Sequence, residues 1–168
     1  SIAFGRATDT EDHLGETIST APLPSRAAVR AALPSLTGRI EQVPSRFSAK
    51  RVEGRRAYDL ARQGVAVELR PVAITVHSWE ILDWSGSEDA VESCAVRVTC
   101  SGGTYVRALA RDLSAAVGSA AHLSALRRTH IGPFAVTDAV DLPMLRDGVV
   151  TLRPPSDALP QYPEVRLS

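Results

Sequence analysis

Residues 100–113 read CSGGTYVRALARDL, and the chain continues through SAAV to Gly118. Apolar side chains in this stretch recur at i, i+3, i+4, i+7 and i+11, the spacing of one face of an amphipathic helix. They are Val106, Leu109, Ala110, Leu113 and Val117. Gly118 is the expected C-terminal glycine. The stretch therefore predicts a helix over residues 105–117 that packs one face on a core.

Two glycines shape the start of this helix. Gly102 and Gly103 let the backbone turn tightly just before it. The first helical turn then presents Tyr105 and Arg107 at the N-terminal end, where an anion is favoured. A guanidinium there can pair with a carboxylate or phosphate in bidentate geometry, which lysine could not copy. A solvated arginine on a surface helix is an equally good interpretation of the same residues.

Upstream of the helix, the sequence predicts β-structure. Residues 65–69, 72–82 and 90–99 are rich in Val, Ile, Trp and Thr. The last two stretches alternate well enough for strands with one buried face. WSGSED, residues 84–89, is expected to join them as a hairpin connection.

The first forty residues predict a strand, a loop, a second strand and a helix. Residues 1–4 read as the end of a strand, 5–15 as a polar loop and 16–19 as a short returning strand. Ser25 is expected to cap a helix that ends near Pro34.

Two segments between residues 40 and 63 give different signals. Residues 40–52, IEQVPSRFSAKRV, follow neither the strand nor the helix period, and Pro44 would interrupt a strand. An exposed loop or a short irregular strand is therefore expected there. Residues 56–63 place apolar side chains at helical spacing and stop at Gly64, which predicts a short helix.

Charge and composition set broad limits. The chain has 168 residues, of which 44% are hydrophobic and 23% charged, as in an ordinary globular domain. Nineteen basic residues balance nineteen acidic ones, but the basic residues cluster in two groups. The groups are Arg39, Arg46, Lys50, Arg51, Arg55, Arg56 and Arg62, and then Arg107, Arg111, Arg127 and Arg128. Such stripes bind phosphate or form solvated helix faces.

Several classes of protein have no support in the sequence. Cys94 and Cys100 match neither metal-ligand spacing nor a disulfide framework, so a reducing cytoplasm is the simplest location. No apolar run reaches a membrane span, and the first residues lack the basic and apolar regions that a signal peptide would have, so secretion is not expected. The chain opens with SIAFG, without methionine and within a strand-like pattern, so we expect it to be a fragment.

Four motifs make the sequence more specific. They are GRATDTEDHLGE (5–16), QVPSRFSAKRVEGRRAYDLARQG (42–64), CSGGTYVRALARDL (100–113) and AHLSALRRTHIGPF (121–134). In this order and spacing they resemble the bacterial B-type tRNA pseudouridine-55 synthases, the TruB family. The resemblance implies an α+β fold, a mixed and mostly antiparallel sheet with packed helices, here in truncated form.

The resemblance also implies a reaction. Members isomerise the uridine at position 55 of the tRNA T loop, need no metal or organic cofactor, and flip the target base into a pocket where an aspartate acts. That aspartate lies in a Gly-x-Leu-Asp-x-x-Ala-x-Gly motif, which these 168 residues do not contain. Asp83 in ILDWSG sits at an expected turn and is rejected as the nucleophile. We therefore expect this chain alone to be inactive; the alternative is a non-catalytic RNA-binding module.

Individual residues are carried over from the family motifs. Arg107 matches the arginine that orients the catalytic aspartate, Tyr105 a pocket tyrosine and Leu126 an apolar pocket residue. Positions near bound RNA in the family are matched by Asp12, Ser48, Arg51, Tyr58 and Arg128. Two departures are noted: Gly102 stands where many members have lysine, which removes a possible phosphate contact, and Arg51 stands where lysine is usual, which keeps the charge.

The resemblance also suggests how the chain is divided and what it contacts. Residues 1–153 are expected to be part of a catalytic domain, and the proline-rich residues 154–168 a linker toward an RNA-binding domain. The expected partner is the T arm of tRNA, with no membrane and no metal. A sheet cut at Ser1 would leave an unpaired edge, through which the chain could self-associate.

Overall fold

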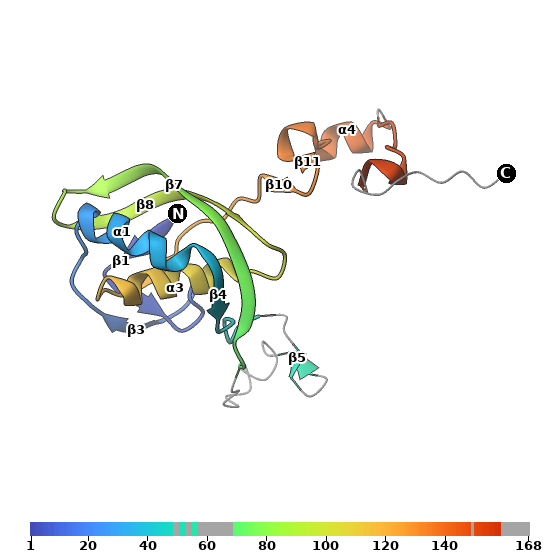
Figure 1. Cartoon of the computed structure of the whole chain (residues 1–168). Helices are drawn as coiled ribbons and strands as arrows, with labels where there is room; N and C mark the ends of the chain where they lie inside the picture. Colours follow the sequence, from blue (N-terminus) through green and yellow to red (C-terminus); the bar gives the residue numbers. More distant parts are fainter. Residues whose placement is uncertain (49–50, 53–54, 57–68, 149, 159–168) are drawn as a thin grey trace. The chain divides into compact units, whose positions relative to one another are not determined.

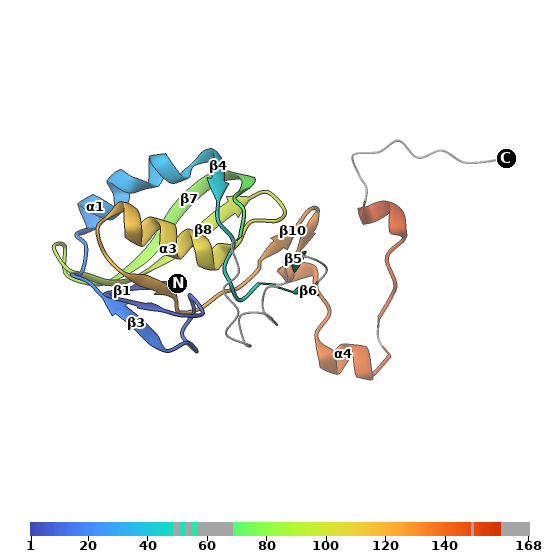
Figure 2. The ribbon, with the colours of Figure 1, turned by 90° about the horizontal axis from the view of Figure 1, so that it is seen from below.

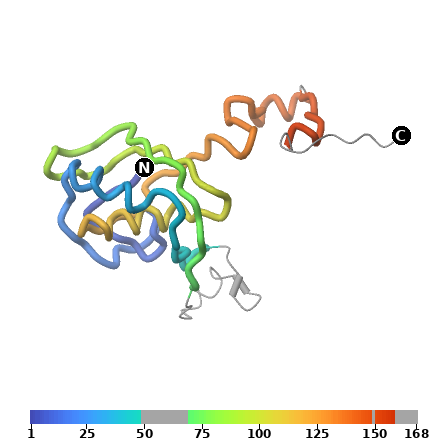
Figure 3. Tube along the Cα trace, in the orientation of Figure 1, coloured from blue at the N-terminus to red at the C-terminus, as the bar shows by residue number. Residues whose placement is uncertain are grey.

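The computed structural model describes residues 1–48, 51–52, 55–56, 69–148 and 150–158. The chain divides into two compact units, Ser1–Leu126 and Arg127–Ser168. The path of the chain through the first unit can be followed in Figure 3. Strands and helices are mixed in it, and each pair of strands among its described residues is antiparallel, so the predicted α+β class is confirmed.

A five-stranded sheet forms the frame of the first unit, with the order β4-β7-β8-β1-β9 (Figure 1). The strands are β1 (Ile2–Phe4), β4 (Gly38–Gln42), β7 (Val72–Gly86), β8 (Val91–Cys100) and β9 (Ala121–Leu123). The predicted hairpin is the long β7–β8 pair. Its first strand runs to Gly86, further than expected, and the pairing continues to Gly86 and Val91 across three shifts of register.

Two helices pack on this sheet. They are α1 (Arg26–Ala32), followed by the 3-10 helix η1 (Leu33–Leu36), and α3 (Val106–Ala116). Figure 2 shows α1 and α3 side by side over the same sheet face. Ser25 caps α1 as predicted, since its hydroxyl accepts a hydrogen bond from the Ala28 amide at 3.1 Å. The predicted helix over residues 105–117 is confirmed as α3.

The apolar face of α3 fills the core. Leu113 lies in a buried cluster with Val29 of α1 and Ile2 of β1, and Leu109 in a second cluster with Val76 of β7. These side chains are at most 2% exposed. Burying a leucine of this kind contributes about 2 kcal/mol, so the packing fixes where α3 begins and where its first turn points.

A small hairpin lies before α1. It consists of β2 (Arg6–Thr8) and β3 (Thr17–Thr20), joined by a turn over residues 9–16. The predicted returning strand is confirmed with a shift of one residue, but the loop expected over residues 5–15 is wrong for Arg6–Thr8, which form β2 by pairing with β3. Within the turn, the Glu11 carbonyl accepts a hydrogen bond from the Leu123 amide of β9 at 3.0 Å. This contact fastens the turn to the edge of the sheet.

Three expectations for the first unit need correction. Residues 38–42 form the regular strand β4, paired with β7, because Pro44 stands two residues beyond its end and interrupts nothing. Arg56, expected to open a helix, lies in the two-residue strand β6 (Arg55–Arg56), which pairs with β5 (Arg51–Val52). The rest of that expected helix, 57–63, lies outside the described residues.

The third correction concerns the expected open edge. The first strand, β1, is paired on both sides, with β8 through Ile2 and Cys94 and with β9 through Ile2 and Leu123. The described sheet ends instead at β4 and β9. The prediction of an unpaired edge at Ser1 is therefore wrong, and self-association through it loses its basis.

The second unit is built from short elements. A hairpin joins β10 (His130–Ile131) to β11 (Phe134–Ala135) across Gly132, whose φ is 55°. The 3-10 helix η2 (Val136–Asp138), the helix α4 (Leu142–Arg146) and the 3-10 helix η3 (Pro155–Ala158) follow. The Asp141 carboxylate caps α4 by accepting from the Met144 amide at 2.9 Å.

Candidate functional site

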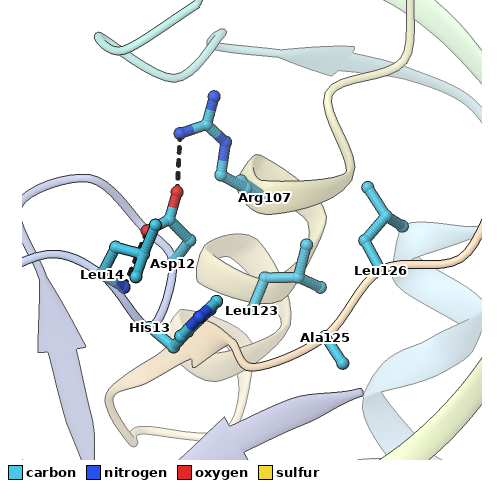
Figure 4. A pocket seen from close by; sticks show the side chains of 7 residues that line it. All are labelled: Asp12, His13, Leu14, Arg107, Leu123, Ala125 and Leu126. Atoms are coloured by element: carbon cyan, nitrogen blue, oxygen red, sulfur yellow. Dashed lines mark hydrogen bonds and ion pairs between the residues drawn. The ribbon is translucent and has the colours of Figure 1, made fainter.

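A small cavity opens between the turn 9–16, the first half of α3 and the residues that follow β9 (Figure 4). Its volume is about 220 Å³. The side chains that line it are Asp12, His13, Leu14, Arg107, Leu123, Ala125 and Leu126. Leucines and an alanine form most of the wall, while Arg107 and Asp12 point toward each other at one side. The cavity thus combines an apolar surface with one ion pair.

Both terminal nitrogens of the Arg107 guanidinium donate hydrogen bonds. Nη1 donates to the Thr10 carbonyl at 3.0 Å and to Oδ2 of Asp12 at 3.1 Å, and Nη2 donates to the Phe47 carbonyl at 2.5 Å. Its side chain is 28% exposed. Of the two interpretations left open by the sequence, the solvated surface arginine is therefore excluded. The carboxylate that Arg107 meets belongs to this chain.

Asp12 is held as a carboxylate by its surroundings. Partial burial acts to raise the pKa of Asp12, but hydrogen bonds from the Thr10 hydroxyl at 2.8 Å and the Leu14 amide at 3.0 Å, with the positive charge of Arg107, outweigh it. The pKa of Asp12 therefore lies below its usual value. At neutral pH Asp12 is therefore ionised.

The turn that carries Asp12 is fixed from within. Oδ1 of Asp9 accepts hydrogen bonds from the Thr10 amide at 2.8 Å and the Glu16 amide at 2.9 Å. A Cβ at Gly15 would collide with the side chains of Asp9 and Thr10 and would stand 3.0 Å from the Thr10 nitrogen. The turn therefore presents Asp12, His13 and Leu14 to the cavity in one conformation.

A second arginine lies one helical turn further along α3. Nη1 of Arg111 donates to Oε1 of Glu11 at 2.7 Å, and Nη2 donates to the Val43 carbonyl at 2.7 Å. Arg111 also pairs with Asp112, at 2.8 Å from Nη2. Burial acts to lower the pKa of Arg111, but the charges of Glu11 and Asp112 raise it further than burial lowers it. Arg111 therefore stays charged although it is half-buried.

Tyr105 is positioned through its backbone. The side chain of Gln42 is fully buried; its Nε2 donates to the Tyr105 carbonyl at 3.2 Å, and its Oε1 accepts from the Tyr105 amide at 2.9 Å. The side-chain amide of Gln42 thus satisfies the N–H and C=O groups of Tyr105 and fixes where the chain enters α3. The Tyr105 ring is not among the seven side chains that line the cavity.

The remaining residues predicted for the site lie in several places. Leu126 lines the cavity and is 63% exposed. Ser48 is buried, and its Oγ has no hydrogen-bond partner in the described part of the chain. Arg51 lies in β5, Arg128 is exposed in the second unit, and Tyr58 lies outside the described residues. The structure thus brings Arg107, Asp12 and Leu126 together.

Sequence reasoning missed several residues of the site. His13 and Leu14 line the cavity, and Leu14 is 81% exposed, although both lie inside a quoted motif. Glu11 and Gln42 act through contacts that span 100 and 63 residues of sequence. The one available signal was that Arg107 and Arg111 are four residues apart and so share a helix face.

Neither a metal site nor a membrane span is found in the part of the chain that the structure describes. No group of three or more His, Cys, Asp or Glu side chains is arranged there to hold a metal ion. No helix in the described ranges has both the length and the apolar character to cross a membrane.

Two family models match nearly the whole chain. The model "TruB family pseudouridylate synthase (N terminal domain)" matches residues 1–106, and the model "tRNA pseudouridylate synthase B C-terminal domain" matches residues 107–159. The first model alone covers more than half of the chain.

Curated relatives agree with these models. The chain is similar to "tRNA pseudouridine synthase B" of Symbiobacterium thermophilum, with 43% identity over 99% of the chain and 56% of the relative. It is also similar to the proteins of that name from Thermobifida fusca (41% identity, 100% of the chain, 59% of the relative) and Novosphingobium aromaticivorans (44%, 86% and 48%). The chain spans about half the length of the curated relatives it matches.

A solved structure is more distantly similar. It is a chain from the "Crystal Structure of a Cbf5-Nop10-Gar1 Complex", with 24% identity, a TM-score of 0.47, and coverage of 80% of this chain and 30% of that one.

Proposed function

Because the chain belongs to the TruB family of pseudouridylate synthases, we propose that this protein converts the uridine at position 55 of the tRNA T loop to pseudouridine. In that reaction the glycosidic bond between C1′ and N1 breaks and a bond between C1′ and C5 forms, while C5 loses a proton and N1 gains one, so that the product is an isomer of uridine. The observation that carries the proposal is the Arg107–Asp12 pair beside a small apolar cavity.

The cavity has the character that a flipped base requires. A base taken from its stack loses favourable contacts, and apolar or aromatic walls replace part of them. Leu14, Leu123 and Leu126 supply such walls here. We assign Leu126 to base packing and Arg107 to orienting the catalytic carboxylate, and we assign Tyr105 to the same pocket from the family resemblance.

Contacts to the RNA backbone and loop bases are proposed for five further residues. They are Asp12, Ser48, Arg51, Tyr58 and Arg128. The buried Ser48 hydroxyl, without a partner in the described residues, supports a polar contact with a ligand. Folded RNA is recognised largely through shape and backbone contacts, so these residues would read the form of the T arm rather than its sequence.

A second function, binding of the T arm without chemistry, is favoured by one observation. The carboxylate that Arg107 meets is Asp12, and the 168 residues contain no Gly-x-Leu-Asp-x-x-Ala-x-Gly motif. We therefore propose that the chain alone binds the T arm without turnover, through residues 1–153 of the catalytic domain, with 154–168 as a linker. The alternative function is a T-arm-binding module that carries out no chemistry at all. Either role belongs in the cytoplasm.

Binding to a T-arm stem-loop tests the proposal. The 168-residue chain should bind a fluorescent T-arm stem-loop at least about tenfold more tightly than an anticodon stem-loop of equal length, a preference of about 1.4 kcal/mol. It should release no tritium from RNA labelled at C5 of uridine. Equal affinity for both RNAs would overturn T-arm recognition, and tritium release would overturn the inactivity of the chain.

Arg107→Lys separates the two functions. In an active enzyme made by joining this chain to the N-terminal portion of the Symbiobacterium relative, the variant should lose turnover by about a hundredfold or more, since an ammonium cannot reproduce a positioned guanidinium fork. T-arm affinity should fall much less. If turnover and affinity fall by the same factor, Arg107 acts in binding only, which would overturn its assignment to orienting the catalytic carboxylate.

A further inference from the structure

Glu11 has an unusual backbone conformation. Its φ is 61°, and it is the one non-glycine residue with positive φ among the residues that the structure describes. Side chains other than that of glycine rarely adopt this left-handed conformation, and where it persists the surroundings must hold it. Glu11 immediately precedes Asp12, so its conformation sets the direction in which the Asp12 carboxylate points.

Three contacts hold Glu11 in place. Its amide donates to the Thr8 carbonyl at 3.1 Å, its carbonyl accepts from the Leu123 amide at 3.0 Å, and its carboxylate receives Nη1 of Arg111 at 2.7 Å. The Glu11 side chain is 15% exposed, and Oε2 is buried with no partner in the described part of the chain. A carboxylate so placed depends on its counter-charge, which Arg111 supplies.

Arg111 and Arg107 make equivalent contacts from one face of α3. Arg107 holds the carbonyls of Thr10 and Phe47, and Arg111 holds the side chain of Glu11 and the carbonyl of Val43. Both arginines thus join the turn 9–16 to residues 43–47 from adjacent turns of a helix packed in the core. Only Arg107 lines the cavity.

We propose that Glu11 and Arg111 form a positioning pair, which holds the left-handed turn at residue 11 so that Asp12 faces Arg107 at the cavity. The inference rests on the proposed function only where RNA binding is the readout. Neither residue needs to touch RNA. Arg111 pairs with the Glu11 carboxylate, Glu11 fixes the conformation of the turn, and the turn directs the Asp12 carboxylate.

Glycine at position 11 gives a specific test, because glycine adopts positive φ without strain and has no carboxylate to leave unpaired. Arg111→Met in the 168-residue chain should weaken T-arm stem-loop binding about tenfold, equivalent to about 1.4 kcal/mol. The pKa of Asp12, followed by NMR, should rise toward its ordinary value. Adding Glu11→Gly to Arg111→Met should return both quantities most of the way. Adding Glu11→Ala should not, since alanine removes the carboxylate but keeps the strain.

Controls separate positioning from loss of fold. Arg97→Met breaks the exposed Arg97–Glu80 pair between β7 and β8 and should change neither quantity. Thermal unfolding of each variant reports its fold. If Arg111→Met does not fold, Glu11→Gly and Glu11→Ala in the unmodified chain give the same comparison, with glycine expected to perturb Asp12 less.

Two results would overturn the positioning pair. One is an unchanged Asp12 titration in folded Arg111→Met, and the other is equal behaviour of the glycine and alanine variants. If the unmodified chain shows no preference for the T arm, the proposed function fails. The Asp12 titration then still decides whether the pair positions the turn.

Discussion

The Arg107 guanidinium meets three acceptors that come from two separate segments, the carbonyls of Thr10 and Phe47 and the carboxylate of Asp12. A lysine ammonium could reach one of them but could not span the set, because the three donors of an ammonium radiate from a single nitrogen. Arg107 therefore fixes geometry as well as charge. Its direction is set by contacts within the chain itself.

The Asp12 carboxylate gives the site a defined pH dependence. Its pKa is lower in the folded chain than in the unfolded one, so the stabilisation is complete above the unfolded pKa of about 3.9 and is lost as pH falls through the folded pKa. Asp12→Asn should therefore lower the free energy of unfolding at pH 7 by about 1 kcal/mol, the scale of a partly exposed pair. Urea unfolding of both chains between pH 7 and pH 2.5 measures this.

The difference between the two chains should shrink below pH 4. A difference that stays constant down to pH 2.5 would show that the carboxylate is not the source of the stabilisation.

Sequence reasoning reached part of this residue-level picture. The double glycine and the helix period predicted that Arg107 stands at the start of a helix, and they left open whether it faces an anion or solvent. The partner could not be predicted from the residues, since Asp12 lies 95 residues away and meets Arg107 only when the turn closes on α3. The sequence also does not predict the strained conformation of Glu11, because tertiary contacts impose it.

At the scale of elements, the regular spacing of apolar residues over long stretches predicted helices and strands correctly. The single residue Pro44 did not predict where a strand ends. The helix α3 and the β7–β8 hairpin follow from their patterns because each buries one regular face. For residues 40–52 a loop or a short irregular strand was expected instead of the regular strand β4, because Pro44 was given weight beyond its own position. A single proline ends a strand only where its missing amide or its ring would fall within the ladder.

The turn 9–16 yields a prediction with a matched control. Gly15→Ala should weaken T-arm binding about tenfold, since its Cβ would displace the Asp9 and Thr10 side chains that order the turn. Gly102→Ala makes the same chemical change at a glycine whose Cβ would meet nothing within 4 Å. It should bind as the unmodified chain does. Fluorescence anisotropy with the T-arm stem-loop measures both, and equal affinities for the two variants would show that the order of the turn does not matter for binding.

At the scale of the whole molecule, the core and the cavity lie in one of the two compact units. Every buried residue of the two core clusters, and every residue that lines the cavity, lies within Ser1–Leu126. The second unit carries Arg128, for which the family resemblance predicts an RNA contact. The sequence also predicted, from proline content, that residues 154–168 form a linker, of which 159–168 lie outside the described residues; the compact units divide after Leu126. Composition marks linkers, but units follow from contacts that composition does not record.

This distribution predicts the behaviour of a chain shortened to residues 1–126. Because the core lies within it, the midpoint of thermal unfolding should stay within a few degrees of that of the full chain, where about 1 kcal/mol corresponds to roughly 4 °C. T-arm binding should persist but weaken.

If Arg128 neutralises one phosphate, the slope of log K against log salt should become shallower by about 0.7 to 0.9 in the shortened chain. Arg128→Gln in the full chain should give the same change. An unchanged slope in both proteins would remove Arg128 from the interface, while a shortened chain that does not fold would show that the first unit depends on residues 127–168.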